Sequence, residues 1–178
     1  MDLDCGIAEL PTDVSLKAAL ELNELLTSRD TKIAHLRELI KQTGIHGCLS
    51  DGFLLRFLRA RKFNIHRALA SYIAYYETRN LYADVFLNLR PKCIQHVFSD
   101  CVVARLATPL PNGCAVVYFQ PGQWNPRSWP ITDIFRANVI LVEDLLLVSW
   151  EPALGKTNSQ NGCVPPISRV GGLVNERK

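Results

Sequence analysis

The chain has 178 residues, of which 48% are hydrophobic and 21% charged, with a formal net charge of +3. This composition is that of a folded globular protein, and its mild charge gives no reason to expect a nucleic-acid partner. The six cysteines form no CxxC pair and have no closely spaced histidine, so we expect reduced thiols, no metal site and no cofactor. An acidic start and the lack of a long apolar run favour a cytoplasmic protein without a membrane span.

Two helices are predicted near the N-terminus. Residues 1 to 13 are a polar leader, which ends in a helix cap at Thr12 or Asp13. The first helix spans 14 to 26, with three charged side chains on its outer side: Lys17, Glu21 and Glu24. Ser28 is the predicted cap of the second helix, whose apolar residues recur at helical spacing until Gly44 stops it.

The segment from Asp51 to Phe63 combines large apolar side chains with cations. A cap at Ser50 or Asp51 opens a helix whose two faces differ. One arc is apolar (Phe53, Leu54, Phe57, Leu58), and Arg56 and Arg59 lie opposite it. Continuing the helix would turn Arg61 into the apolar arc, so either the helix ends near Ala60 or Arg61 meets a buried partner.

Asn64 is the predicted cap of the next helix, which carries apolar and aromatic residues along one face. Its tyrosines, among them Tyr72 and Tyr76, fit either of two roles. An aromatic stripe could line a ligand site, but packing against Phe53 and Phe57 is the simpler interpretation. The pair of helices forms an αα-hairpin, and the first domain is therefore a helical bundle.

The hydrophobic period changes after a short helix predicted over 91 to 98. Two valine-rich runs, 101 to 107 and 114 to 119, predict adjacent antiparallel strands joined by a turn at Asn112-Gly113. Their near-continuous apolarity predicts cover on both faces. Thr132 is the predicted cap of a long helix to about Trp150, which is apolar nearly all round and should be buried. Its polar residues Asn138 and Ser149 either hydrogen-bond to a neighbouring strand or to water, which is the favoured interpretation, or make a polar contact with an otherwise apolar ligand.

The last part of the chain, 151 to 178, is rich in glycine and proline and reads as a disordered tail, where Pro165-Pro166 forbids a central strand. We therefore divide the chain into a leader and first helix (1–28), a helical domain (29–90), the start of an α/β domain (91–150) and the tail.

No catalytic constellation is present, so we expect a protein that is not an enzyme. Gly155-Lys156-Thr157 lacks the first glycine of a phosphate-binding loop, because Trp150 stands there. The concentrated cations are Arg56, Arg59, Arg61, Lys62 and Arg67. They suit phosphate recognition, and a phospholipid headgroup is favoured over nucleic acid because no aromatic ladder accompanies them. The alternative is a solvated helix face with one structural ion pair.

Two stretches carry a resemblance to a known family. The string FLLRFLRARKF within 51–63, with the tyrosine helix after it, and Gln123-Trp124-Asn125-Pro126 before the helix at 132 resemble the CRAL-TRIO family. The likeness is greatest to its alpha-tocopherol transfer protein-like and clavesin branch, over about 29 to 150.

The resemblance implies a helical N-terminal domain followed by an α/β lipid-binding domain that encloses one hydrophobic ligand. It implies a carrier of tocopherol- or retinoid-like lipids that binds phosphatidylinositol bisphosphate membranes, as a cytoplasmic monomer that reaches endosomal membranes peripherally. The headgroup candidates are Arg59 and Arg61, with Arg56 and Lys62, and Arg59 ranks above Arg61. The pocket candidates are Phe135, Asn138, Val139 and Val142.

The resemblance stops before the lipid-binding domain is complete. After Asn161-Gly162, Cys163-Val164-Pro165-Pro166 is not expected to continue as the core strand, so we expect a C-terminally truncated form. Two functions follow from this: a lipid-transfer protein represented by an incomplete chain, or a helical interaction or membrane-surface module that has lost its cargo.

Overall fold

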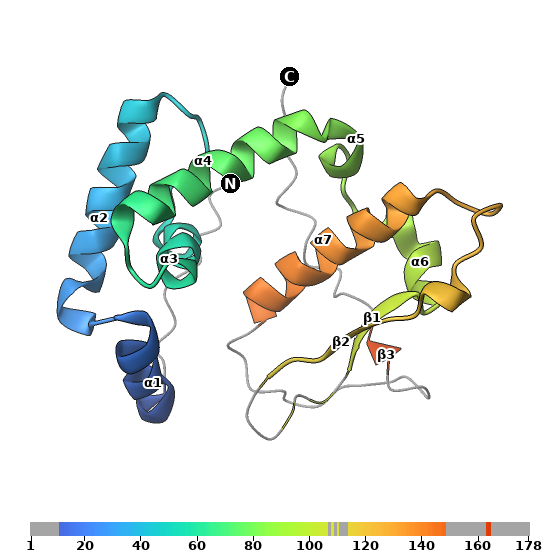
Figure 1. Ribbon diagram of the computed structural model, residues 1–178, viewed down its shortest axis with the longest axis horizontal. Helices are drawn as coiled ribbons and strands as arrows, with labels where there is room; N and C mark the ends of the chain where they lie inside the picture. The colour runs from blue at the N-terminus through green and yellow to red at the C-terminus, as the bar shows by residue number, and fades with distance from the viewer. Residues whose placement is uncertain (1–10, 107, 109, 111–113, 149–162, 165–178) are drawn as a thin grey trace. The chain divides into compact units, whose positions relative to one another are not determined.

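The computed structural model describes residues 11–106, 108, 110, 114–148, 163 and 164. The chain divides into two compact units, Met1–Leu81 and Tyr82–Lys178, and each is described by itself. The first unit is helical and the second is α/β (Figure 1), as the sequence predicts. Within the described residues, no helix is both long enough and apolar enough to span a bilayer.

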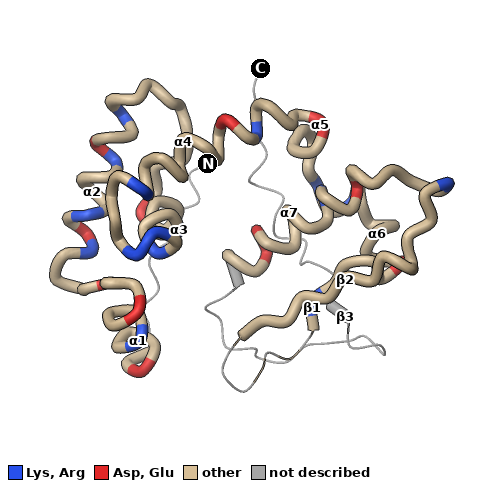
Figure 2. The backbone as a smooth tube through the Cα atoms, in the orientation of Figure 1, with Lys and Arg blue, Asp and Glu red and all other residues tan. Residues whose placement is uncertain are grey.

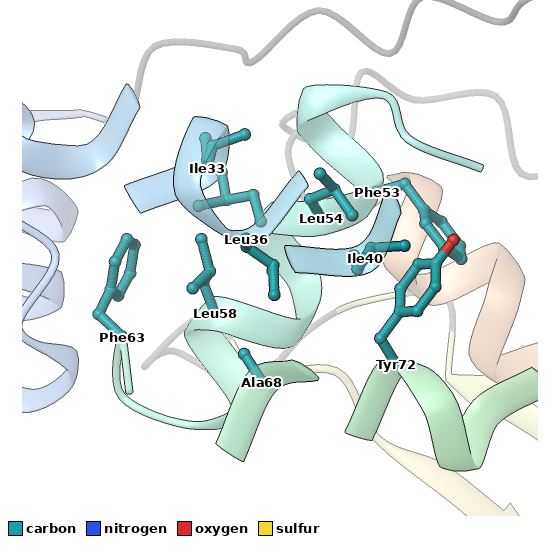
Figure 3. Packing of buried hydrophobic residues seen from close by; sticks show 10 residues of the cluster. Ile33, Leu36, Ile40, Phe53, Leu54, Leu58, Phe63, Ala68 and Tyr72 are labelled. Carbon is teal, nitrogen blue, oxygen red and sulfur yellow. The ribbon is translucent and has the colours of Figure 1, made fainter. Parts of the chain in front are cut away.

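From residue 11 onward the first unit contains four helices: α1 (Thr12–Leu22), α2 (Leu26–Thr43), α3 (Asp51–Ala60) and α4 (Ile65–Leu81). Its core lies where α2, α3 and α4 meet. Ile33, Leu36 and Ile40 of α2 point toward Leu54 and Leu58 of α3, and α4 closes the cluster with Ala68 and Tyr72 (Figure 3).

The aromatic stripe of α4 belongs to this core. Tyr72 is fully buried, and its ring lies 6.3 Å from Phe53 and 5.4 Å from Phe57 in edge-to-face contacts. The Tyr72 hydroxyl donates to the carbonyl of Cys48, and the Cys48 N–H donates to the hydroxyl of Tyr76 over 2.8 Å. The tyrosines therefore pack the αα-hairpin and hold the loop before α3.

Several predicted helix boundaries are correct. Gly44 ends α2 with a φ of 71°, and α3 ends at Ala60. The side chain of Asn64 accepts the N–H of Arg67, so it caps α4. Ser50 occupies the N-cap position of α3, but its side chain makes no capping hydrogen bond.

The predictions for the first helices need correction. The helix that we expected to reach Leu26 ends at Leu22, because Asn23 turns into the left-handed region with a φ of 60°. That turn carries Glu24 inward, so its side chain is buried instead of lying on the outer side. The N-cap of α2 is Leu25, and the predicted cap Ser28 lies inside the first turn.

The second unit is built around a three-stranded sheet in the order β2-β1-β3. It begins with α5 (Ala83–Phe86), the 3-10 helix η1 (Pro91–Ile94) and α6 (Gln95–Ser99). Strand β1 (Val103–Leu106) pairs antiparallel with β2 (Val117–Phe119), with Ala104 opposite Tyr118. A short 3-10 helix, η2 (Pro121–Gln123), precedes α7 (Ile131–Val148), one face of which packs on β1 and α6.

Burial in this unit is one-sided, which corrects two predictions. Strand β2 was expected to be covered on both faces, yet Val117 and Phe119 are exposed. Helix α7 was expected to be buried all round, yet only the face with Ile134, Ala137 and Ile140 enters the core. Apolarity along a segment indicates which side chains favour burial, but the described residues supply cover on one side only.

Two further details of the second unit differ from the predictions. Helix α7 begins at Ile131, one residue before its predicted cap Thr132. Cys163 and Val164 form a short strand, β3, at the edge beside β1, with Val164 opposite Arg105. Pro165 and Pro166 lack only their own backbone N–H donors, so the pairing of Cys163 and Val164 with β1 remains possible. The turn at Asn112-Gly113, Ser149, and the rest of the tail lie outside the described residues.

Candidate headgroup and ligand surfaces

The first candidate surface is the turn between α3 and α4. Two backbone hydrogen bonds end the helix after Ala60. The Lys62 N–H donates to the Arg59 carbonyl, and the Phe63 N–H donates to the Leu58 carbonyl. This pattern is a Schellman motif, in which the residue at the Lys62 position takes a left-handed conformation and is usually glycine. Phe63 is buried with Leu58 in the core, which completes the motif.

The motif puts Lys62 at an unfavourable backbone conformation. Its φ is 51°, and that of Phe63 is 58°. A left-handed conformation costs a residue with a side chain roughly 1–2 kcal/mol, which glycine avoids. A strained residue that carries an exposed cation is a reason to look for a function at that position.

Arg59 is engaged in an ion pair inside the first unit. Its Nε and Nη2 donate to the two carboxylate oxygens of Glu24 over 2.8 and 2.7 Å. Glu24 is 2% exposed, whereas the Arg59 side chain is 34% exposed. A bidentate pair with a buried carboxylate fixes both side chains and neutralises the charge of the arginine. Arg59 therefore joins the α1–α2 connection to the end of α3.

Arg61 and Lys62 are placed differently. Both side chains are exposed, and Arg61 Nε donates to the hydroxyl of Ser71 on α4 over 2.7 Å. That bond orients the guanidinium without neutralising it, because the partner is uncharged. Lys32 of α2 also reaches this place, with Nζ 5.4 Å from the centroid of the Phe63 ring. Figure 2 shows that basic residues gather at α3 and at the turn after it. We call Arg61 and Lys62 the basic turn.

Arg56 lies one turn before Arg59 on α3. Its guanidinium carbon is 5.6 Å from the centroid of the Phe53 ring, and the side chain is partly buried. The contacts thus separate the four headgroup candidates: Arg56 and Arg59 are tied to the helical core, whereas Arg61 and Lys62 face solvent. The ranking of Arg59 above Arg61 finds no support in these contacts, because Arg59 is the residue with the buried anionic partner.

The second candidate surface lies on α7. Phe135, Asn138, Val139 and Val142 follow each other at helical spacing and share one side of the helix, which we call the α7 stripe. Phe135 and Val142 are 55% and 52% exposed, while Asn138 and Val139 are partly buried. Exposed Ile131 and Leu146 extend the stripe at both ends.

The one polar group in the stripe has a local partner. The side-chain amide of Asn138 donates to the carbonyl of Ile134, one turn earlier in α7, over 2.9 Å. Asn138 was predicted to bond a neighbouring strand, water or a ligand, and this donor instead bonds its own helix. The α7 stripe as described is an open apolar surface and not a closed pocket.

Sequence reasoning missed three residues of the α3–α4 region. Glu24 was placed outside its helix because the break at Asn23 was not foreseen. Lys32 and Ser71 come close to the basic turn only through the packing of α2 and α4. No local pattern in the sequence signals either one.

Comparison with known proteins places these surfaces in a family context. Residues 20–73 match the model of the CRAL/TRIO N-terminal domain. The human alpha-tocopherol transfer protein-like protein is 35% identical over 142 residues, which cover 79% of this chain and 42% of that protein. Human clavesin-2 is 29% identical over 143 residues (78% and 44%), and clavesin-1 of Xenopus laevis is 31% identical over 150 residues (75% and 45%).

The chain thus spans less than half the length of these curated relatives. The matched region contains all of α2 and α3 and more than half of α4, so it includes the Schellman turn and the basic residues. The chain has a CRAL/TRIO N-terminal domain, and it belongs to the CRAL-TRIO family.

Proposed function

We propose that this chain binds phosphoinositide-containing membrane surfaces through the basic turn and acts, in its complete form, as a carrier of a small hydrophobic ligand. The proposal includes no enzymatic activity. It places the protein in the cytoplasm, with a peripheral association with endosomal membranes. The observation that carries it is the pair of exposed cations at Arg61 and Lys62.

The electrostatics of the turn support this reading. Glu24 neutralises Arg59, but an uncharged hydroxyl orients Arg61. A guanidinium held in one direction can bind a phosphate through paired hydrogen bonds, and a neighbouring ammonium adds a point charge. Lys32 brings a third cation to the same region. A phosphoinositide headgroup carries several phosphates, so a cluster of this kind suits it better than a single anion would.

The test is co-sedimentation of the full chain with phosphatidylcholine vesicles that contain phosphatidylinositol bisphosphate. Replacing both Arg61 and Lys62 by alanine should weaken binding roughly thirtyfold, because each cation near an anionic membrane contributes about 1 kcal/mol. The matched control replaces Lys41 and Lys92, which are exposed cations outside the turn. Equal losses in both double variants would mean that net charge, and not the turn, determines binding.

The cargo half of the proposal concerns the α7 stripe. Its apolar side chains are those that a tocopherol- or retinoid-like ligand would contact, and the human relative is named for its likeness to alpha-tocopherol transfer protein. Saturable binding of a fluorescent tocopherol or retinoid analogue, lowered by Phe135→Ser, would support a carrier.

The exposure of the α7 stripe also favours a second candidate function. A surface that is open on one side gives a ligand less cover than an enclosed cavity does. A membrane-surface module without cargo would bind the vesicles as described but would take up neither lipid probe. The probe titration therefore separates the two candidates without affecting the headgroup test.

A further inference from the structure

The beginning of α2 has leucines where helix stability would favour polar residues. Leu25 occupies the N-cap position and makes no side-chain capping bond, and Leu26 is the first helical residue. Serine, threonine, aspartate and asparagine are the residues that stabilise an N-cap, and leucine is among the poorest. Leu25 is 53% exposed and Leu26 is 61% exposed, so core packing does not explain them.

Residues on both sides of these leucines in sequence contact residues that flank the basic turn. Glu24, which immediately precedes Leu25, is bonded through both carboxylate oxygens to Arg59, two residues before Arg61. Seven residues after Leu25, Lys32 lies against the ring of Phe63, the neighbour of Lys62. Glu24 before the leucines and Lys32 after them therefore contact Arg59 and Phe63, which stand on either side of Arg61 and Lys62 in sequence.

Exposed leucines beside exposed cations are the combination that an anionic bilayer surface accepts. Apolar side chains insert at the level of the headgroups and upper acyl chains, while cations remain among the phosphates. A soluble protein partner would also cover leucines, but it would not by itself account for the neighbouring positive charge. Charge complementarity thus favours a membrane as the occupant.

We propose that Leu25 and Leu26 form an insertion element that enters the bilayer interface when the basic turn binds headgroups. This inference rests on the proposed membrane function and deepens it, since it adds a hydrophobic component to an electrostatic one. Binding should then persist in part at high salt, because salt screens the cations and leaves apolar insertion intact.

Leu25→Asn makes the test independent of misfolding. Asparagine is a favoured N-cap residue, so the midpoint of urea unfolding should rise, while the affinity for phosphatidylinositol bisphosphate vesicles should fall roughly fivefold. Leu26→Ser should lower the affinity to a similar extent. The matched control is Leu81→Asn, at the end of α4, where the leucine is 74% exposed and has no part in the element. Its affinity should equal that of the wild type.

The outcomes separate the inference from the function on which it rests. If the wild-type chain binds the vesicles and Leu25→Asn binds them with the affinity of the wild type in both low and high salt, insertion is wrong and the headgroup proposal stands. If the wild-type chain does not bind at all, both are wrong. If the wild type is a dimer by light scattering and Leu25→Asn is a monomer, the leucines cover a second copy of the chain, which also overturns insertion.

Discussion

Replacing Arg59 by alanine should destabilise the helical unit, although Arg59 is one of the predicted headgroup residues. The substitution removes both hydrogen bonds to Glu24 and leaves a carboxylate that is 2% exposed without its cation. Breaking a fully buried pair costs about 3–5 kcal/mol. Because the Arg59 side chain is 34% exposed, water can reach the pair, and we expect a loss of about 2–3 kcal/mol.

The measurement is equilibrium urea unfolding of the full chain, followed by far-ultraviolet circular dichroism. Arg67→Ala is the control, because this cation is exposed nearby on α4 and should change the free energy of unfolding by at most about 0.5 kcal/mol. Combining Arg59→Gln with Glu24→Gln removes both charges together and should cost less than Arg59→Ala alone. A free energy of unfolding for Arg59→Ala within about 0.5 kcal/mol of the wild type would refute the structural role.

Three further predictions concern packing and ionisation. Gly47→Ala should destabilise the first unit by about 1–3 kcal/mol in urea unfolding, because the new Cβ would overlap the Tyr72 hydroxyl oxygen. Its control is Gly122→Ala, whose Cβ meets open space and which should be nearly neutral. Burial and the neighbouring Tyr76 hold the pKa of Tyr72 above its usual value of 10.0. Above pH 10 the unfolded chain therefore loses this proton more readily than the folded chain, so the free energy of unfolding should fall as pH rises. Tyr72→Phe should remove this loss in thermal melts at alkaline pH. Ile140→Ala should cost about 2–4 kcal/mol and Val142→Ala under about 0.5 kcal/mol, and equal costs would mean that the α7 stripe is covered.

The helical unit could be predicted from the sequence because its signals are local. Gly44, Asn64 and the apolar arc of α3 act within one or two turns, and the structure has each where the pattern predicts it. The end of α1 was missed because Asn23 adopts a left-handed conformation that helix propensity does not reveal. Once that turn is known, the burial of Glu24 follows, and with it the partner of Arg59.

The candidate surfaces could be predicted only in part. The cations near α3 are evident in the sequence, but which of them keep their charge depends on a residue 35 positions away. On α7, residue spacing correctly groups Phe135 with Val142 on one side. Their exposure could not be predicted, because apolarity records what a side chain prefers and not whether a neighbouring element covers it.

The most direct test of the account is the vesicle affinity of Lys62→Gly. Glycine relieves a left-handed conformation that costs roughly 1–2 kcal/mol, but its greater freedom in the unfolded chain destabilises the folded state by about 0.5–1 kcal/mol. This variant should therefore be at least as stable as the wild type. Losing one cation should nevertheless weaken binding to phosphatidylinositol bisphosphate vesicles about fivefold. If the variant binds with unchanged affinity, the basic turn is not the headgroup site.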